Sequence, residues 1–326
     1  MFKNVAKLAR KIKTQGTKVL ADWIYYLSKK SYVLNQLAWE VTQKCNLNCK
    51  HCYLGDKAVK ELKTKDAVRW MDEFMKIEGY WLTYVLLTGG EPLLREDLPE
   101  LVDQLKKRGI KRLGLMTNGT LIDEKKAGWI KEIGFEQIGI SLDGLEAGHD
   151  NIRGKGEYKK TIRGLECLIK EGLGDRILIK TLIYPKNIDE ISSLYKYLSE
   201  IGIKNWHWLT VISIGNARGN ESLKVGGPLF ESMIKKATKI KSEGIMNLNI
   251  NENSDPQGQK GERKCTAGIN SMTLLANGDI VPCINSYRKG SYVEGNITKD
   301  SIASIWKMGF RRNRSWGYHE CGIHGR

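Results

Sequence analysis

An α/β fold built on a parallel sheet is the class that this sequence predicts, for three reasons. Short apolar segments alternate with amphipathic helical segments from residue 35 onward. Polar or glycine-rich turns follow the apolar segments, as they do at strand ends in such folds. With 326 residues, of which 41% are hydrophobic, the chain can bury one large core and a smaller one. Six strand–helix units in a row most simply form an open, partial (β/α)6 TIM barrel.

The elements follow one another along the chain with short connections. The predicted strands cover residues 37–42, 84–87, 112–116, 137–141, 177–183 and 205–211. The predicted helices cover residues 64–76, 97–108, 124–133, 158–170, 188–200, 229–241 and 301–307. Thr64 is the candidate N-cap of the first helix, with Asp66 in its first turn. Residues 215–220, which are rich in glycine and asparagine, predict a linker.

The chain divides into three predicted regions. Residues 1–34 predict a basic, amphipathic helical extension. This extension either packs on the main domain or makes peripheral contact with a membrane or a partner through residues 1–30. Residues 35–225 form the predicted barrel core. Residues 226–326 form a smaller region, in which Asn277-Gly278 between apolar pairs predicts a β-hairpin.

Composition excludes several classes of protein. No run of about 18 apolar residues exists, so no transmembrane helix is expected, and the N-terminus lacks the pattern of a signal peptide. Seven cysteines, three of them clustered, argue for a reducing interior, and we expect a cytoplasmic protein. The net charge of +16 indicates either a solvated, Lys-rich surface or attraction to an acidic partner. We expect no nucleic-acid partner, because the sequence carries no such motif.

The densest chemical signal is the run of Cys45, Cys49 and Cys52, spaced Cys-x3-Cys-x2-Cys after the first predicted strand. Three thiolates in eight residues can hold three corners of an iron–sulfur cube, whereas zinc sites and ferredoxin clusters need a fourth protein ligand. The next cysteine is Cys167, far along the chain. A cube with one open iron can bind a small molecule. The alternatives are a chance match or a metal site with a remote fourth ligand.

This spacing resembles the signature of radical S-adenosylmethionine (SAM) enzymes. The resemblance implies a [4Fe–4S] cluster on the three cysteines, with SAM chelated to the open iron. It implies that the reduced cluster cleaves SAM to a 5′-deoxyadenosyl radical, which abstracts a hydrogen atom from a substrate. A flavodoxin or ferredoxin would serve as the electron donor. His51 stands where the family usually has an aromatic residue near the SAM adenine; otherwise it is a surface histidine.

The turns after later strands fit the same resemblance. Gly89, Gly90 and Glu91 follow the second strand and are similar to the family motif that holds the SAM amino group; alone they would predict a plain turn. Ser141 and Arg153 are expected to meet the SAM carboxylate, to which an arginine makes strong charge-assisted hydrogen bonds. The resemblance places two further polar residues nearby, Asn118 and Asp143.

The C-terminal region resembles the extension of the SPASM or twitch subgroup. Cys265 precedes the predicted hairpin, Cys283 follows it, and Cys321 lies near the C-terminus. A full SPASM extension has several more cysteines, and His324 occupies the position of a fourth ligand. The resemblance therefore implies one auxiliary cluster, held by the three cysteines with His324 or with an open iron. Otherwise Cys321 is structural and His324 a terminal residue without a metal role.

Several other residues are of types that could take part in catalysis or binding. Cys167 lies mid-helix among apolar residues, so we expect a core thiol. Trp206, His207 and Trp208 alternate on the sixth strand, so one face should line the barrel interior while at least one tryptophan packs in the core. Tyr184, after the fifth strand, is a candidate for the rim of the site.

The resemblance implies a radical SAM enzyme, and two substrate classes stay open. Maturation of a ribosomally made peptide or protein, by cross-linking, oxidation or epimerisation, is the first hypothesis, with a separate leader-peptide-binding protein as a partner. Oxidation or epimerisation of a small metabolite or sugar is the second. A non-catalytic metal or electron-transfer protein is the distant alternative, which the Gly89-Gly90-Glu91 run disfavours because such a protein needs no SAM pocket.

Overall fold

The computed structural model describes residues 32–55, 61–250, 266–284, 293–311 and 314. Within these residues, ten strands form one sheet in the order β10-β9-β8-β1-β2-β3-β4-β5-β6-β7. Strands β8 and β1 through β7 run parallel to their neighbours, whereas the β8–β9 and β9–β10 pairs are antiparallel. The prediction of an α/β fold with a parallel sheet is confirmed.

Each predicted strand and helix of the described residues is present. The strands are β1 (Gln36–Thr42), β2 (Tyr84–Gly89), β3 (Leu113–Thr117), β4 (Gln137–Ser141), β5 (Ile177–Leu182), β6 (Asn205–Leu209), β7 (Asn247–Ile250), β8 (Ser271–Leu274), β9 (Asp279–Val281) and β10 (Gly295–Asn296). The helices are α3 (Thr64–Phe74), α4 (Leu98–Lys107), α5 (Glu124–Ile133), α6 (Glu146–Arg153), α7 (Glu157–Lys170), α8 (Ile191–Glu200), α9 (Pro228–Glu243) and α11 (Ile302–Met308).

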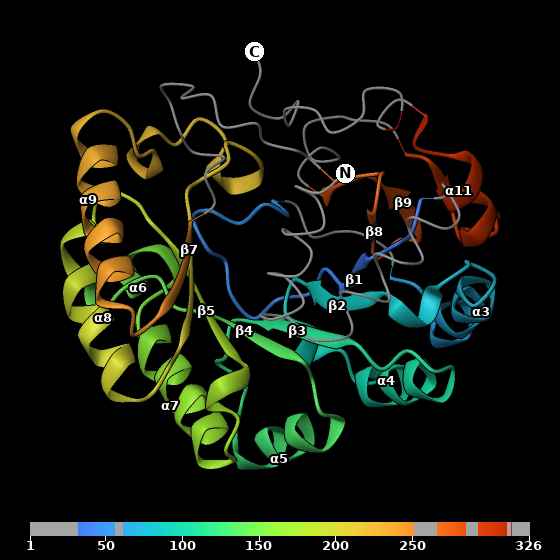
Figure 1. The fold of residues 1–326 in the computed structure, drawn as a ribbon, viewed down its shortest axis with the longest axis horizontal. Coiled ribbons are helices and arrows are strands. Elements are labelled where there is room, and N and C mark those ends of the chain that lie inside the picture. The colour runs from blue at the N-terminus through green and yellow to red at the C-terminus, as the bar shows by residue number, and fades with distance from the viewer. Residues whose placement is uncertain (1–31, 56–60, 251–265, 285–292, 312–313, 315–326) are drawn as a thin grey trace, which may run out of the picture.

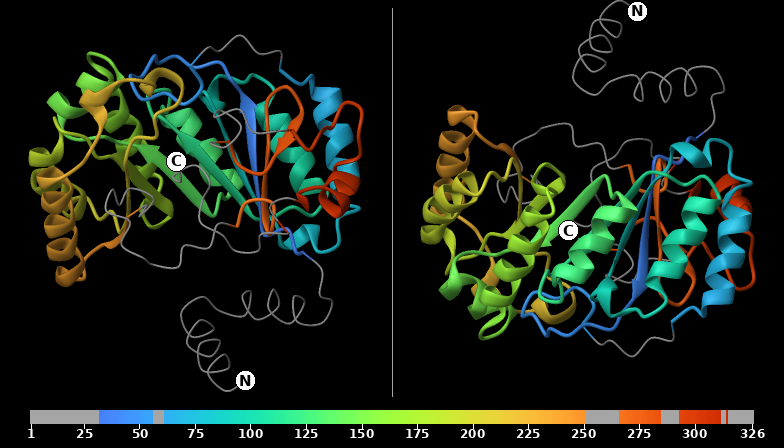
Figure 2. Two further views of the ribbon diagram at one scale, coloured as in Figure 1. Left: turned by 90° about the horizontal axis from the view of Figure 1, so that it is seen from above. Right: turned by 90° about the horizontal axis from the view of Figure 1, so that it is seen from below.

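The long helices cover the outer face of the curved sheet, as Figure 1 and the two views of Figure 2 show. Alternate strand residues point outward and pack on these helices because side chains on a strand alternate between its faces. Trp39 of β1 meets Trp70 of α3 edge-on, with ring centroids 5.0 Å apart. Trp206 and Trp208 of β6 are fully buried, and Trp206 stacks on Tyr195 of α8. The expectation that a tryptophan of this strand packs in the core is confirmed.

Sequence reasoning missed three elements and misassigned one helix cap. It missed α6, which is short, β7, whose four residues Asn-Leu-Asn-Ile carry a weak apolar signal, and β10, which has two residues. Strand β7 extends the main sheet beyond residue 225, so the sheet runs past the predicted boundary of the core. Thr64 is not the N-cap of α3; Lys63 is, and the Thr64 hydroxyl donates to Asp97 instead (2.6 Å). The predicted helical extension at residues 1–34 lies almost wholly outside the described residues.

The C-terminal region joins the main sheet at its β1 edge. Strand β8 pairs with β1 in parallel, and β9 folds back on β8 through the turn at Asn277 and Gly278, so the predicted hairpin is confirmed. Gly278 adopts φ 90°, a conformation that favours glycine. Helix α11 lies beside α3, where the Ser301 hydroxyl donates to Glu73 (2.6 Å). No helix in the described ranges combines the length and apolar character that crossing a bilayer requires.

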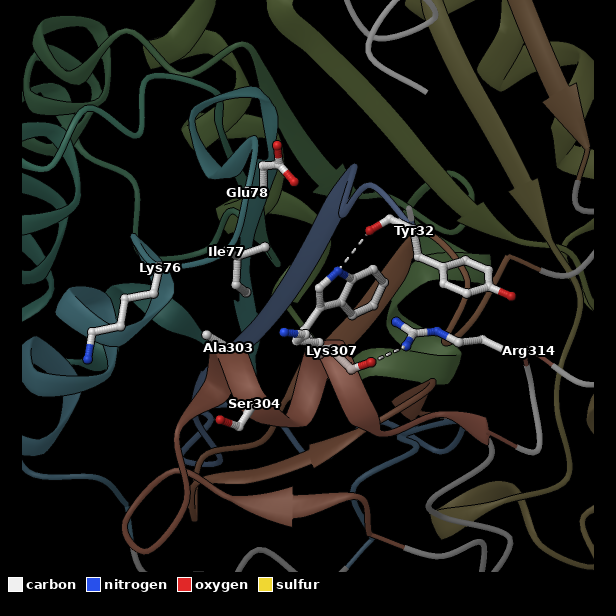
Figure 3. A pocket seen from close by; sticks show the side chains of 9 residues that line it. Tyr32, Lys76, Ile77, Glu78, Ala303, Ser304, Lys307 and Arg314 are labelled. Atoms are coloured by element: carbon white, nitrogen blue, oxygen red, sulfur yellow. Dashed lines mark hydrogen bonds between the residues drawn. The ribbon is translucent and has the colours of Figure 1, made fainter. Parts of the chain in front are cut away.

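A pocket of about 430 Å³ lies between α11 and the residues that follow α3 (Figure 3). Arg314 borders it, with its guanidinium carbon 4.3 Å from the ring centroid of Tyr32 and 4.6 Å from that of Trp306. Arg314 also donates to the carbonyl groups of Gly268 (3.0 Å) and Lys307 (3.3 Å). One side chain therefore ties together the entry to β1, the turn before β8 and the end of α11.

Replacing Arg314 with alanine should loosen this joint. Cation–π contacts and hydrogen bonds of this kind contribute about 1 kcal/mol each, so we expect a loss of about 2 kcal/mol in local stability. Hydrogen exchange of the backbone amides of α11 measures the effect. Arg311→Ala is the matched control, because Arg311 is exposed and donates to the Met308 carbonyl (3.2 Å). Equal protection of α11 in both variants would contradict the role given to Arg314.

Candidate functional site

The carboxyl ends of the parallel strands meet at one edge of the sheet, and a pocket of about 260 Å³ lies there. The cysteine loop after β1 forms one wall, and the ends of β2 through β6 form the others. All three clustered cysteines line the pocket, together with these predicted site residues: His51, Gly89, Gly90, Asn118, Ser141, Asp143 and Arg153. Residues predicted at the ends of four strands, together with Arg153 of α6, are therefore gathered around one cavity.

The cysteine loop is held in place by backbone hydrogen bonds. The Lys50 amide donates to the Ile152 carbonyl of α6 (2.9 Å), and the Cys52 amide donates to the Cys49 carbonyl (3.1 Å). Cys49 is buried, while Cys45 and Cys52 are partly exposed. The loop thus presents three thiols toward the pocket from a fixed backbone.

The surroundings of these cysteines disfavour a free thiolate and favour thiolates that bind a metal cluster. Burial raises the pKa of Cys49 to about 11, and the neighbouring Asp143, Cys52 and Cys45 add to this shift against the opposing charge of Arg153. Positively charged irons would compensate for the clustered negative charge, and thiolates suit iron–sulfur clusters. Among the described residues, no three His, Cys, Asp or Glu side chains are placed to hold a single metal ion. That finding does not bear on a cluster, because each thiolate there binds a different iron.

Gly89 and Gly90 allow the end of β2 to lie directly against the start of the cysteine loop. A Cβ atom on Gly89 would come within 2.1 Å of the Thr42 carbonyl oxygen, and one on Gly90 within 2.2 Å of that of Lys44. The Gly90 amide donates to Thr42 and the Glu91 amide to Lys44, both at 2.8 Å. The close approach that two glycines indicated is therefore made first of all to the protein's own backbone.

Replacing Gly90 with alanine should displace the cysteine loop. Inserting a methyl group into packed backbone costs about 1–3 kcal/mol, and here the neighbours are carbonyl groups that cannot rotate away. We expect a lower unfolding midpoint and a lower iron content after reconstitution. Gly128→Ala in α5 is the matched control, because nothing lies within 4 Å of its Cβ position and alanine favours helices. If both variants bind iron equally, the loop does not depend on this contact.

Glu91 connects β2 to β3 within the protein. Its carboxylate is fully buried and accepts from the Asn118 amide (2.7 Å), the Thr117 hydroxyl (2.7 Å) and the Leu93 amide (3.2 Å). Burial raises the pKa of Glu91 to about 7, although these hydrogen bonds oppose the shift. Glu91 is not among the residues that line the pocket. These contacts fix the carboxylate beside the end of β3, and its contact with the SAM amino group stays a prediction.

Arg153 and Asp143 form a buried ion pair at the base of the pocket. Arg153 Nε lies 2.6 Å from Asp143 Oδ2, and the side chains are 9% and 0% exposed. Asp143 Oδ1 also accepts from the Leu182 amide (2.8 Å). Burial alone would raise the pKa of Asp143, but the Arg153 charge holds it below its usual range. The pair joins α6 to the ends of β4 and β5, a link that sequence reasoning did not foresee.

The two terminal nitrogens of the Arg153 guanidinium point toward the cysteine loop. Arg153 Nη1 is 3.9 Å from Cys49 Sγ, and Nη2 is 3.5 Å from His51 Nε2. Burial lowers the pKa of His51 to about 4, and the Arg153 charge adds to this effect. His51 is therefore neutral at pH 7 and lines the pocket, rather than standing on the outer surface as its alternative interpretation required.

Asparagine side chains secure the loop on two sides. Asn118 donates to Asn46 Oδ1 (3.0 Å), which fixes the first half of the loop to the turn after β3. On the other side, the Asn216 side chain donates to the Cys49 carbonyl (3.0 Å) and its amide to the Cys52 carbonyl (2.9 Å). The prediction of a linker at residues 215–220 is wrong at this point. Gly215 and Asn216 of this segment pack closely on the loop instead of spanning a gap.

Several residues that line the pocket were not predicted, because they belong to no sequence motif. Lys180 of β5 lines the pocket, flanked by Leu182 and by Leu209 of β6. Tyr184, predicted at the rim, is 1% exposed and donates to the Gly148 carbonyl (2.7 Å), so it belongs to the core. Cys167 is 3% exposed, which confirms a core thiol. The alternation of side chains along β5 was the one sequence signal that could have indicated that Lys180 faces the pocket.

The C-terminal ligand candidates are only partly described. Cys283 follows β9 and is partly exposed. Cys265, Cys321 and His324 lie outside the described residues, so the proposed auxiliary-cluster ligands stay predictions.

Sequence comparisons identify two domains in this chain. The model of the radical SAM superfamily matches residues 39–198, and that of the SPASM iron–sulfur cluster-binding domain matches residues 265–322. Fe-coproporphyrin III synthase of Methanosarcina barkeri is 31% identical over 217 residues, or 64% of this chain and about half (53%) of that protein. Mycofactocin maturase MftC of Mycolicibacterium smegmatis is 33% identical over 285 residues, or 83% of this chain and 69% of MftC.

The fold is also found among solved structures. Streptococcus suis SuiB bound to its precursor peptide SuiA superposes with a TM-score of 0.69 at 16% identity, covering 93% of this chain and 77% of SuiB. The arrangement of barrel and C-terminal region is therefore shared with that protein.

Proposed function

The chain belongs to the radical SAM superfamily and carries a SPASM domain, and from this premise we propose that it modifies a ribosomally made peptide or protein. The radical SAM domain implies a [4Fe–4S] cluster and SAM, and the SPASM domain implies auxiliary iron–sulfur clusters. When bound, the reduced cluster supplies a 5′-deoxyadenosyl radical from SAM, which removes a hydrogen atom from the substrate. The substrate class is the part of the activity that is proposed here.

In this proposal, Cys45, Cys49 and Cys52 bind the [4Fe–4S] cluster. Their placement around one pocket, next to the positive charge of Arg153, supports the assignment. The pocket residues Ser141 and Arg153 position the SAM carboxylate, and the backbone of Gly89 and Gly90 faces its amino group. Glu91 binds the SAM amino group together with this backbone, and Asn118 and Asp143 lie near the cofactor. His51 packs beside the adenine as a neutral ring.

We propose one auxiliary cluster in the C-terminal region, held by Cys265, Cys283 and Cys321 with His324 or an open iron as the fourth position. The match of the SPASM model to residues 265–322 supports the three cysteines. His ligation would raise the reduction potential of the cluster relative to an all-cysteine set.

The similarity to a maturase supports a peptide substrate, since MftC is similar over 83% of this chain. SuiB, which shares the fold, binds a precursor peptide. The net charge of +16 would favour an acidic peptide.

A tetrapyrrole substrate is the second candidate. Fe-coproporphyrin III synthase is similar over 64% of this chain, so a carboxylate-rich small molecule is the alternative that the comparisons support.

Anaerobic reconstitution with iron, sulfide, SAM and dithionite tests the proposal. The reconstituted enzyme is incubated with peptides encoded beside its gene and, separately, with coproporphyrin III. We expect 5′-deoxyadenosine together with a mass change on a peptide. A mass change on the porphyrin alone would overturn the peptide assignment while leaving radical SAM chemistry intact.

A further inference from the structure

Four polar residues form a row across neighbouring strands on the concave face of the sheet. Ser141 of β4 pairs in register with Lys180 of β5, Lys180 with His207 of β6, and His207 with Asn249 of β7. Because the strands are parallel and in register, all four lie at the same height in the barrel. We propose that Lys180 and His207 bind a carboxylate group of the substrate, which deepens the proposed function by naming the chemistry of the group recognised.

Lys180 carries a positive charge into the pocket without a matching carboxylate. It is partly buried, lines the pocket and lies in register with Ser141. No ion pair in the described part of the chain includes Lys180, and Asp143, the carboxylate that lines the pocket, is paired with Arg153. Burial lowers the pKa of Lys180, and the Arg153 charge lowers it further. An incoming carboxylate would offset both effects, since a buried charge is costly until it is paired.

His207 supplies a neutral hydrogen-bond donor beside this charge. Its neighbours Trp206 and Trp208 face outward into the core, so strand alternation turns His207 inward. Burial lowers the pKa of His207 to about 4, and the adjacent Lys180 charge contributes. A neutral imidazole next to an ammonium group can donate to one carboxylate oxygen while lysine pairs with the other.

The row extends away from the position proposed for the SAM carboxylate. Neighbouring strands lie about 4.8 Å apart, so the distance from Ser141 to Asn249 across three strand spacings is about 14 Å. The Ser141 end adjoins Asp143, Arg153 and the cysteine loop, where the SAM carboxylate is proposed to lie. The His207 and Asn249 end points away from that loop, toward the far edge of the sheet.

The apolar residues around Lys180 sharpen the specificity. Leu182 and Leu209 are paired in register one level above Lys180 and His207, and both line the pocket. A carboxylate attached to a short aliphatic chain fits here, because the chain can pack on Leu182 and Leu209 while the carboxylate pairs with Lys180. Such groups occur as Asp and Glu side chains or peptide C-termini, and also as the propionates of coproporphyrin III.

Two matched pairs of probes test the inference on the reconstituted full chain with SAM. The first pair is a pool of Asp- and Glu-containing peptides with free C-termini and the same pool with Asn, Gln and C-terminal amides. The second pair is coproporphyrin III and its tetramethyl ester. Affinity-selection mass spectrometry measures the peptides, and fluorescence titration measures the porphyrins. The enzyme variants are Lys180→Met, Lys180→Arg and His207→Phe, with Lys186→Met as the control because Lys186 is exposed just after β5.

We expect the wild type to prefer the carboxylate form of at least one pair. Lys180→Met should weaken that binding at least about tenfold, the effect of losing one charged hydrogen bond, while Lys180→Arg and Lys186→Met retain most of it. The Kd for SAM and the iron content should stay at wild-type values, which shows that Lys180→Met folds.

Three results would overturn the inference. The first is equal binding of the carboxylate and neutral forms by the wild type. The second is unchanged carboxylate binding by Lys180→Met. The third is a weaker Kd for SAM in that variant, which would assign Lys180 to SAM. If only coproporphyrin III shows the dependence on Lys180, the peptide proposal fails and the carboxylate inference stands.

Discussion

Replacing Cys49 with alanine is expected to abolish 5′-deoxyadenosine formation. Cys49 is the buried member of the three clustered cysteines, and its thiol interacts electrostatically with Arg153 and with the other two thiols. Without it, two thiolates would face a cluster that needs three protein ligands, and Cys167, in α7, does not line the pocket. The expected loss exceeds the about 10–100-fold that removal of a supporting residue typically causes at metal sites.

Iron and sulfide content, the visible absorbance of the reconstituted protein and product formation measure this effect together. Cys167→Ala is the matched control, because it removes a buried thiol from α7, far from the loop in sequence and outside the pocket lining. That variant should keep its iron and its product while losing some stability through the cavity it leaves. A Cys49→Ala protein that still forms 5′-deoxyadenosine at the wild-type rate would refute the assignment of the three ligands.

The fold could be predicted from the sequence because its signals are local. Helix α5 and strand β4 have the predicted bounds, since Asp123 caps the start of α5, Gly134 ends it, and β4 is a short apolar segment between polar turns. Strand β7 escaped because Asn247 and Asn249 alternate with only two apolar residues, a pattern that is equally typical of a loop. Its pairing with β6 stabilises it, and that partner is distant in sequence.

The candidate site was predictable to the extent that its residues sit in motifs. The cysteines and the glycine pair were found from spacing and from their place after strands. The hydrogen-bond partners of these residues were not, because they depend on which turns meet in space. Asn216, in a segment that composition assigns to a linker, holds the carbonyls of Cys49 and Cys52. Lys180 looks like any strand lysine until its register with Ser141 and His207 is known.

The ion pair of Arg153 and Asp143 links the backbone at the end of β5 to the cysteine loop. One nitrogen of Arg153 is committed to Asp143, which in turn fixes the Leu182 amide at the end of β5. The other two nitrogens face Cys49 and His51. Arginine suits this position because its planar, permanently charged fork can serve three directions at once, which a lysine could not. The orientation of Arg153 toward the cysteine loop is therefore set before SAM binds.

Replacing Arg153 with methionine is expected to lower the free energy of unfolding by about 3–5 kcal/mol, the cost of leaving a buried charge unpaired. Asp143, 0% exposed, would lose the partner that keeps its pKa low. In the wild type, a lowered pKa means that the pair stabilises the fold above the ordinary pKa of an aspartate. That contribution is lost as the pH falls through the lower pKa of the folded state. Urea unfolding of the metal-free protein under reducing conditions measures the midpoint at each pH.

The double variant Asp143→Asn/Arg153→Met separates charge from packing. Asparagine keeps an oxygen for the Leu182 amide but removes the uncompensated charge, so the double variant should recover about half or more of the lost stability. Its 5′-deoxyadenosine formation should nevertheless stay low, because Arg153 also faces Cys49. A double variant no more stable than Arg153→Met would show that the unpaired carboxylate is not the cause of the loss. Recovery of both stability and product would show that Arg153 serves the fold alone.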